Sequence, residues 1–167
     1  MSFPQTIDIE IIGSVNIYLG FLLQVFMAFL LGGLIGLDRE KKLKAAGIKT
    51  NVLICLGATI YTSISLLNDG EGQTAYDPNR MAAQIVSGIG FLGAGAILRG
   101  PGGGISGLTT AATIWVVAAI GVAIGMGYPF MASISTIGIL FALTLINPIY
   151  KLFSVKREFA VKILSNK

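Results

Sequence analysis

The chain has 167 residues, of which 54% are hydrophobic and only 12% are charged, whereas soluble domains carry about 25% charged residues. The mean hydropathy is +0.80, and a domain of this size cannot hide so much apolar surface in its own core. The lack of histidine and the single cysteine, Cys55, argue against histidine-ligated metal or haem sites and against an intramolecular disulfide. Composition therefore predicts an integral membrane protein.

Five apolar segments are long enough, or nearly long enough, to cross a bilayer core of about 30 Å. They cover residues 16–37, 51–67, 81–98, 108–126 and 129–150. We expect an all-α fold in which residues 1–154 form five transmembrane helices and residues 155–167 form a short cytosolic tail. The expected end of the first helix is Gly47, and the expected caps of the second, third and fourth helices are Thr50 or Asn51, Asp77 and Ser106.

The basic residues predict the orientation in the membrane. Five follow the first segment, one follows the third and five lie in the tail, so a five-span arrangement puts all of these on one side. Arg80 is then the only one of the twelve basic residues on the opposite side. Because basic loops stay in the cytoplasm, we expect the N-terminus outside, the C-terminus inside, and a multi-pass protein of a bacterial cytoplasmic (inner) membrane. The net charge of +4 belongs to these loops, and no nucleic-acid partner is expected.

Glycine is unusually frequent in the third segment. Gly88, Gly90 and Gly93 match the G-x-G-x-x-G dinucleotide pattern, but that pattern needs a preceding strand, and here it lies in the middle of an apolar span. Two interpretations stay open: close helix packing through small residues, or a break that exposes backbone carbonyls to a ligand or ion path. The glycines considered for packing or a break are Gly32, Gly36, Gly88, Gly90, Gly93, Gly95, Gly121 and Gly125.

Two polar clusters are candidate binding sites. At the outer end of the third segment, Asp77, Arg80 and Gln84 share one helix face. Helix capping explains Asp77, whereas an unpartnered amide at the depth of Gln84 is costly. At the cytosolic face the candidates are Asp38, Arg39, Glu40, Lys49, Arg99 and Thr109.

The cytosolic cluster mixes two chemistries. Basic residues and helix N-termini favour anions, while Asp38 and Glu40 have the oxygen ligands that hold cations. The identity of any metal is left open, and no cofactor is expected, although Mg²⁺ fits such ligands. The sequence has no pairing of a nucleophile with a histidine and no phosphate-binding loop, so we do not expect an enzyme.

These motifs resemble a known family. The stretch from Gly33 to Glu40, with Ala46 to Thr50 after it, resembles the first signature of the MgtC/SapB family. The stretch from Asp77 to Gly95 resembles the most characteristic motif of that family, and Gly107 to Trp115 follows at the expected place. Two positions depart from the pattern: Asp38 stands where glutamate is usual, and Lys49 stands where arginine is common, which keeps the charge but loses the bidentate fork.

The resemblance implies a five-span bacterial inner-membrane protein associated with magnesium limitation and with virulence. It favours a modulator that binds partner membrane proteins, and a homodimer is the expected assembly. An ion transporter or channel, with Mg²⁺ as one candidate ion, and a scaffold without ligand are the alternatives. Many family members carry a cytosolic ACT-like domain after the spans; this sequence, which stops at Lys167, is expected to lack it.

Overall fold

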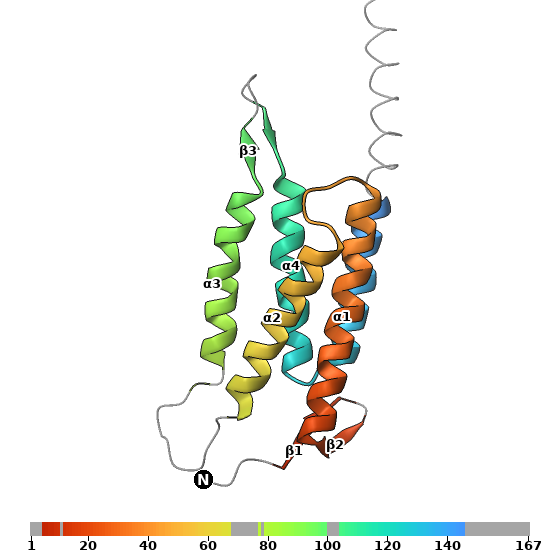
Figure 1. Ribbon diagram of the computed structural model, residues 1–167, viewed down its shortest axis with the longest axis vertical. Helices are drawn as coiled ribbons and strands as arrows, with labels where there is room; N and C mark the ends of the chain where they lie inside the picture. Colours follow the sequence, from red (N-terminus) through yellow and green to blue (C-terminus); the bar gives the residue numbers. More distant parts are fainter. Residues whose placement is uncertain (1–4, 11, 68–76, 78, 100–103, 146–167) are drawn as a thin grey trace, which may run out of the picture. The chain divides into compact units, whose positions relative to one another are not determined.

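The computed structural model describes residues 5–10, 12–67, 77, 79–99 and 104–145. The chain divides into two compact units, Met1–Thr136 and Ile137–Lys167. The first unit contains β1 (Thr6–Ile9), β2 (Gly13–Asn16), α1 (Ile17–Lys41), α2 (Ile48–Leu67), α3 (Asn79–Gly95), β3 (Leu98–Arg99), β4 (Ile105–Ser106) and α4 (Leu108–Gly125) (Figure 1). A further helix, Pro129–Leu145, begins in the first unit and extends into the second. The expected tail, residues 155–167, and the expected end of the fifth segment at residue 150 lie outside the described residues.

α2 is the helix around which the first unit packs, and glycines bring it close to two neighbours. A Cβ at Gly32 of α1 would lie 2.9 Å from the Asn51 carbonyl oxygen, and one at Gly36 would lie 2.5 Å from Ile48 Cα. On the other side, a Cβ at Gly125 of α4 would lie 2.7 Å from the Thr59 carbonyl oxygen. Only glycine permits such close approach of helix backbones.

Close packing also buries polar side chains of α2 and gives them partners. The Thr59 hydroxyl donates to the Gly121 carbonyl at 2.9 Å. The Ser63 hydroxyl donates to Gln24 Oε1 of α1 at 2.9 Å, and Gln24 Nε2 donates to the Gly125 carbonyl at 3.3 Å. Thr59, Ser63 and Gln24 are all at least 94% buried, and these hydrogen bonds remove the cost of burying them without partners.

The expectation of an all-α fold is wrong in one respect, because two short antiparallel hairpins accompany the helices. In the first, Thr6 pairs with Asn16 and Ile9 pairs with Gly13; Gly13 has φ +80°, which glycine adopts at little cost. In the second, Leu98 pairs with Ser106. The polar–apolar alternation of Thr6–Ile9 is typical of a strand, but it is too short to stand out from its surroundings.

Three predicted helix ends are wrong by a few residues. α1 ends at Lys41 rather than Gly47, and Leu43 takes the left-handed conformation at φ 52°. α2 begins before Thr50 and Asn51, because Glu40 Oε2 accepts a hydrogen bond from the Ile48 amide at 2.8 Å and so serves as its cap. The N-cap of α4 is Gly107 rather than Ser106, whose hydroxyl donates to the Leu98 carbonyl at 3.4 Å. Residue 107 must be a glycine, because a Cβ there would overlap the Ala96 carbonyl oxygen.

The helices place opposite charges at the two ends of the unit. The β1–β2 end carries Asp8 and Glu10, and the α1–α2 turn at the other end carries Lys41, Lys42 and Lys44 (Figure 1). The hairpin is attached by Glu10: its amide donates to the Gly127 carbonyl at 2.8 Å. Its Oε2 accepts from the Phe130 and Met131 amides at 3.1 and 3.3 Å. A carboxylate therefore caps the Pro129–Leu145 helix at its N-terminus, where the helix dipole favours negative charge.

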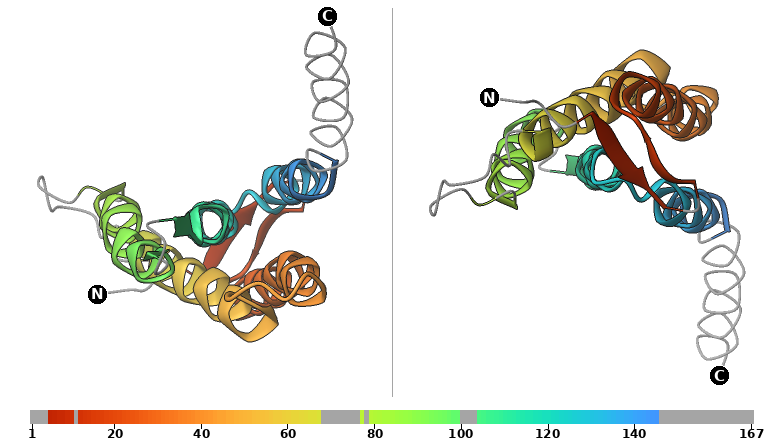
Figure 2. Two further views of the ribbon diagram at one scale, coloured as in Figure 1. Left: turned by 90° about the horizontal axis from the view of Figure 1, so that it is seen from above. Right: turned by 90° about the horizontal axis from the view of Figure 1, so that it is seen from below.

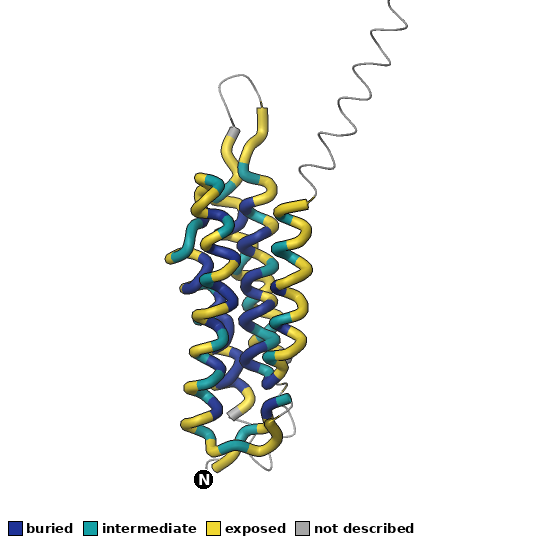
Figure 3. Tube along the Cα trace, turned by 90° about the vertical axis from the view of Figure 1, so that its right-hand side faces the viewer, coloured by how far each residue is buried: buried dark blue, intermediate teal, exposed yellow. Residues whose placement is uncertain are grey.

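Apolar side chains cover much of the outside. Buried residues lie on the facing sides of the helices and exposed residues on the outward sides (Figure 3); Leu22, Phe26 and Phe29 of α1 are each more than half exposed. Within the described residues, α1 and α4 have both the length and the hydropathy of a bilayer span, with mean hydropathies of 2.1 and 2.0. Pro129–Leu145 is apolar but shorter, and α2 carries the buried polar groups described above.

We predict that Gly121→Ala destabilises the protein, because the added methyl group would overlap the Cys55 carbonyl oxygen and the Ala58 side chain. Overpacking of this kind costs about 1 to 3 kcal/mol. Gly90→Ala is the matched control: a Cβ there meets no atom within 4 Å, and alanine favours helix by up to about 1 kcal/mol. Thermal unfolding in detergent should show a lower midpoint for Gly121→Ala only; equal midpoints for both variants would contradict the packing described.

Candidate functional site

A groove lies between α2 and α3. It consists of two adjoining hollows of about 460 and 480 Å³, which share Ile54 of α2 and Leu92 of α3 as lining residues. Apolar side chains line most of it. Polar groups lie toward its two ends, with Tyr61 and Gln84 at one end and Thr50 and Thr110 at the other.

Glycines line the groove from both helices. Gly57 of α2 and Gly88 and Gly95 of α3 border it, and a Cβ built at any of the three would meet no atom within 4 Å. The glycines at the α1–α2 and α2–α4 contacts behave differently, since each of those touches a neighbouring helix. The groove therefore has backbone exposed at a place where a further helix could approach closely.

α3 is a continuous helix through all of its glycines, so the structure contains no break there. Gly93 is the α3 glycine nearest to a neighbour: a Cβ would lie 3.6 Å from the Ala111 carbonyl oxygen of α4. Gly90 has open space around it and is not among the residues that line the groove. Thus the structure places Gly32, Gly36, Gly121 and Gly125 at helix contacts inside the unit, and leaves Gly88, Gly90 and Gly95 uncovered.

The predicted outer cluster is only partly brought together. The Arg80 amide donates to the Asp77 carbonyl at 3.1 Å at the start of α3. The side chains of Asp77 and Arg80 are exposed. Gln84, one turn further on, is also exposed but lines the groove. Of the three, Gln84 is therefore the residue that the structure connects with a hollow.

The predicted cytosolic cluster serves mostly to shape the α1–α2 turn. Asp38 Oδ1 forms an ion pair with Lys42 Nζ at 2.7 Å, and Glu40 caps α2. Arg39 is only 3% exposed, and its Nε and Nη2 have no hydrogen-bond partner among the described residues. Lys49 is exposed.

The remaining members of that cluster lie on other elements. Thr109 is exposed at the start of α4, and its carbonyl accepts from the Thr113 hydroxyl at 2.8 Å. Arg99 belongs to β3, and its side chain lies outside the described part of the structure. In the residues that the structure describes, no group of three or more acidic or cysteine side chains is arranged to hold a metal ion.

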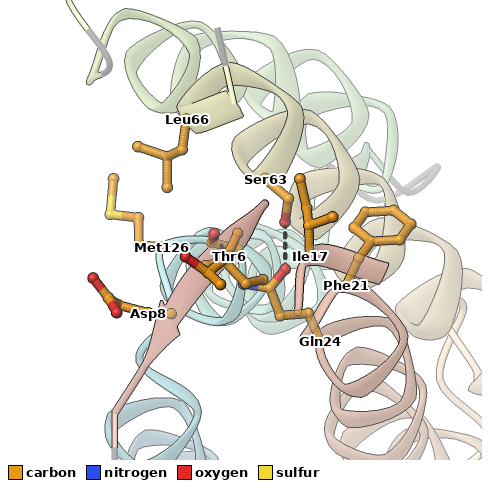
Figure 4. Close-up of a pocket in the computed structure, with 11 residues that line it drawn as sticks. Thr6, Asp8, Ile17, Phe21, Gln24, Ser63, Leu66 and Met126 are labelled. Atoms are coloured by element: carbon orange, nitrogen blue, oxygen red, sulfur yellow. Dashed lines mark hydrogen bonds between the residues drawn. The ribbon is translucent and has the colours of Figure 1, made fainter. Parts of the chain in front are cut away.

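Two residues with structural roles, Asn51 and Ser63, were missed by sequence reasoning. Asn51, considered only as a cap, is completely buried, and its Nδ2 donates to the Ala46 and Gly47 carbonyls at 2.9 and 2.8 Å. Gln24 and Ser63 form a buried pair at the floor of a second cavity near β1 (Figure 4). Gln24 is the lone amide in the apolar part of α1, and a packing hydrogen bond is its expected use, whereas Ser63 is one of several hydroxyl residues of α2 and nothing local marks it as the partner.

The exposed apolar faces and the two helices that have both the length and the hydropathy of a bilayer span indicate a helical membrane protein. Residues 25–152 match the model of the MgtC family. The chain belongs to this family.

Curated relatives support the assignment. The chain is 46% identical to Protein MgtC of Brucella abortus over 122 residues, which are 73% of this chain and 49% of the relative. It is 45% identical to an uncharacterized protein of Haemophilus influenzae over 127 residues, 73% of this chain and 53% of the relative. Identity to Protein MgtC of Salmonella typhi is 40% over 154 residues, 88% of this chain and 64% of the relative. The chain thus spans about half the length of the Brucella and Haemophilus proteins, and no solved structure matches it.

Proposed function

We propose that this protein acts in the inner membrane as a modulator that binds a transmembrane helix of a partner membrane protein in the α2–α3 groove. Membership of the MgtC family and the resemblance noted in the sequence connect this role with magnesium homeostasis and virulence. The observation that carries the proposal is the set of three uncovered glycines, Gly57, Gly88 and Gly95, on both walls of one apolar groove.

Helix association inside a bilayer supports this choice of partner. Lipid tails are as apolar as leucine, so helices associate there through close packing of small residues and through interhelical hydrogen bonds. The groove supplies both: glycines along its walls, and the polar groups of Tyr61 and Gln84 at one end. A second copy of the chain has the same chemistry, which makes a homodimer the competing occupant.

The proposal includes five membrane spans with the N-terminus outside. The opposite charges of the β1–β2 end and the α1–α2 turn support this orientation.

Topology can be tested with Ser14→Cys and Lys44→Cys, both at exposed positions, because the native Cys55 is buried. We expect a membrane-impermeant maleimide to label Ser14→Cys in intact spheroplasts and Lys44→Cys only after permeabilisation. Labelling of Lys44→Cys from outside would contradict the orientation.

Partner docking can be tested by photo-cross-linking in native membranes. A photoreactive p-benzoylphenylalanine at Gly88 should give a discrete adduct, whereas the same group at Trp115, which is 48% exposed on α4 and does not line the groove, should give none. Gly57→Leu, which fills the opposite wall, should abolish the Gly88 adduct. The mass of the adduct distinguishes a partner protein from a second copy of this chain. An adduct that survives Gly57→Leu would contradict docking in the groove.

An ion transporter or channel is the second candidate, and one observation favours it. The cavity at the β1–β2 end is lined by the buried side chains of Gln24 and Ser63, which are hydrogen-bonded to each other. The Ser63 hydroxyl also lies 2.8 Å from the backbone carbonyl of Thr59, one turn away in α2. This arrangement supports a polar route into the bundle.

If that route conducts, liposomes containing the protein should show Mg²⁺, K⁺, Na⁺ or H⁺ flux that is lower for Ser63→Ala than for the unaltered chain. Gly90→Ala is the control, since it changes neither cavity nor groove. Absence of flux for all four ions would exclude this function.

A further inference from the structure

The cavity at the β1–β2 end differs from the groove in both size and lining. It has a volume of about 260 Å³ and is formed by β1, α1, α2 and the turn after α4 (Figure 4). Seen from below, β1 and β2 lie at the ends of the helices (Figure 2). Ile7 of the hairpin packs against Gly20 of α1 and helps to hold β1 over the end of the helices. The volume is just below the range of about 300 to 1,000 Å³ that is typical of small-molecule sites, which favours a small solute over a peptide.

The floor of the cavity offers oriented hydrogen-bonding groups. Gln24 and Ser63 are 4% and 6% exposed. Gln24 Nε2 donates one hydrogen to the Gly125 carbonyl, and Oε1 accepts from Ser63. A primary amide has two donor hydrogens and two acceptor lone pairs, and these two bonds use one of each.

The charge of the lining selects the class of ligand. Asp8 is the only charged residue among the described residues that line the cavity. Its Oδ1 accepts from the Ser14 hydroxyl at 2.5 Å, which holds the carboxylate at the rim. A single negative charge without a basic neighbour in the lining favours a cation over an anion.

The rest of the lining favours an organic cation over a bare metal ion. Ile17, Phe21, Leu66 and Met126 present apolar surface, and a hard cation such as Mg²⁺ needs several oxygen ligands in regular geometry. We propose that this cavity binds a small ammonium compound, whose charged group pairs with Asp8 while its short apolar body packs against Phe21, Leu66 and Met126. The site is independent of the partner-binding groove.

An ammonium group of this size can come from two sources. One is a free amine in solution, and the other is the ethanolamine headgroup of a membrane lipid, because the cavity lies at an end of the helices. Both present the same charged group to Asp8, so the experiment must separate them.

Binding can be measured with n-butylammonium as the probe and n-butanol as its neutral counterpart, by calorimetry on the full chain in detergent and by the shift in unfolding midpoint. We expect butylammonium to bind and to raise the midpoint, and butanol to do neither. Asp8→Asn retains an acceptor for Ser14 but removes the charge, and should weaken binding at least about tenfold. Asp8→Glu should retain binding within a few-fold.

Binding measured in nanodiscs distinguishes a free amine from a lipid headgroup as the natural ligand. If the headgroup is the natural ligand, butylammonium should bind more weakly in phosphatidylethanolamine discs than in phosphatidylglycerol discs; equal affinity in both assigns the site to a free amine. Equal binding of butanol and butylammonium to the unaltered chain, or unchanged affinity in Asp8→Asn, would overturn the proposal, since the cavity would then accept apolar volume without regard to charge.

Discussion

The close contact of α2 with both α1 and α4 is the constraint on which the rest of the structure depends. Gly32 and Gly36 admit α2 on one side, and Gly121 and Gly125 admit it on the other. At this separation the hydroxyl groups of α2 reach the carbonyls of α4 and the amide of Gln24. Because a bilayer offers no water to unpaired polar groups, a wider spacing would leave these groups unsatisfied.

The same contact explains why α3 is the exposed element. The face of α2 that carries Cys55 and Thr59 is occupied by α1 and α4, and the face with Gly57 is left beside α3. Gly93 of α3 approaches Ala111 of α4, whereas Gly88 and Gly95 face open space. A groove results because the small residues on its walls have no helix to pack against within the unit. Its chemistry supports helix docking in the membrane better than binding of a polar substrate.

The two ends of the unit have separate roles in this view. At one end, Glu40, Asn51 and the Asp38–Lys42 ion pair stabilise the α1–α2 turn, so residues that look like a ligand cluster in the sequence are mostly occupied by structural contacts. At the other end, Glu10 joins the hairpin to the last helix, and Asp8 is left at the rim of a cavity. Charged residues at the two ends thus form an ion pair, cap helices and line a candidate binding site.

The sequence alone determined the helical segments, the separation of charge between the two ends and the family, because hydropathy, basic loops and contiguous motifs are local properties of the chain. Its cap assignments at Thr50 or Asn51 and at Ser106 were wrong, because the Glu40 side chain folds back across the turn to cap α2, and residue 107 must be a glycine next to the Ala96 carbonyl. Only the tertiary structure decided which glycines contact a neighbouring helix and that the Ser63 hydroxyl hydrogen-bonds to the Gln24 side chain. Those outcomes depend on which helix faces come together, and residues 39 positions apart carry no local signal of their contact.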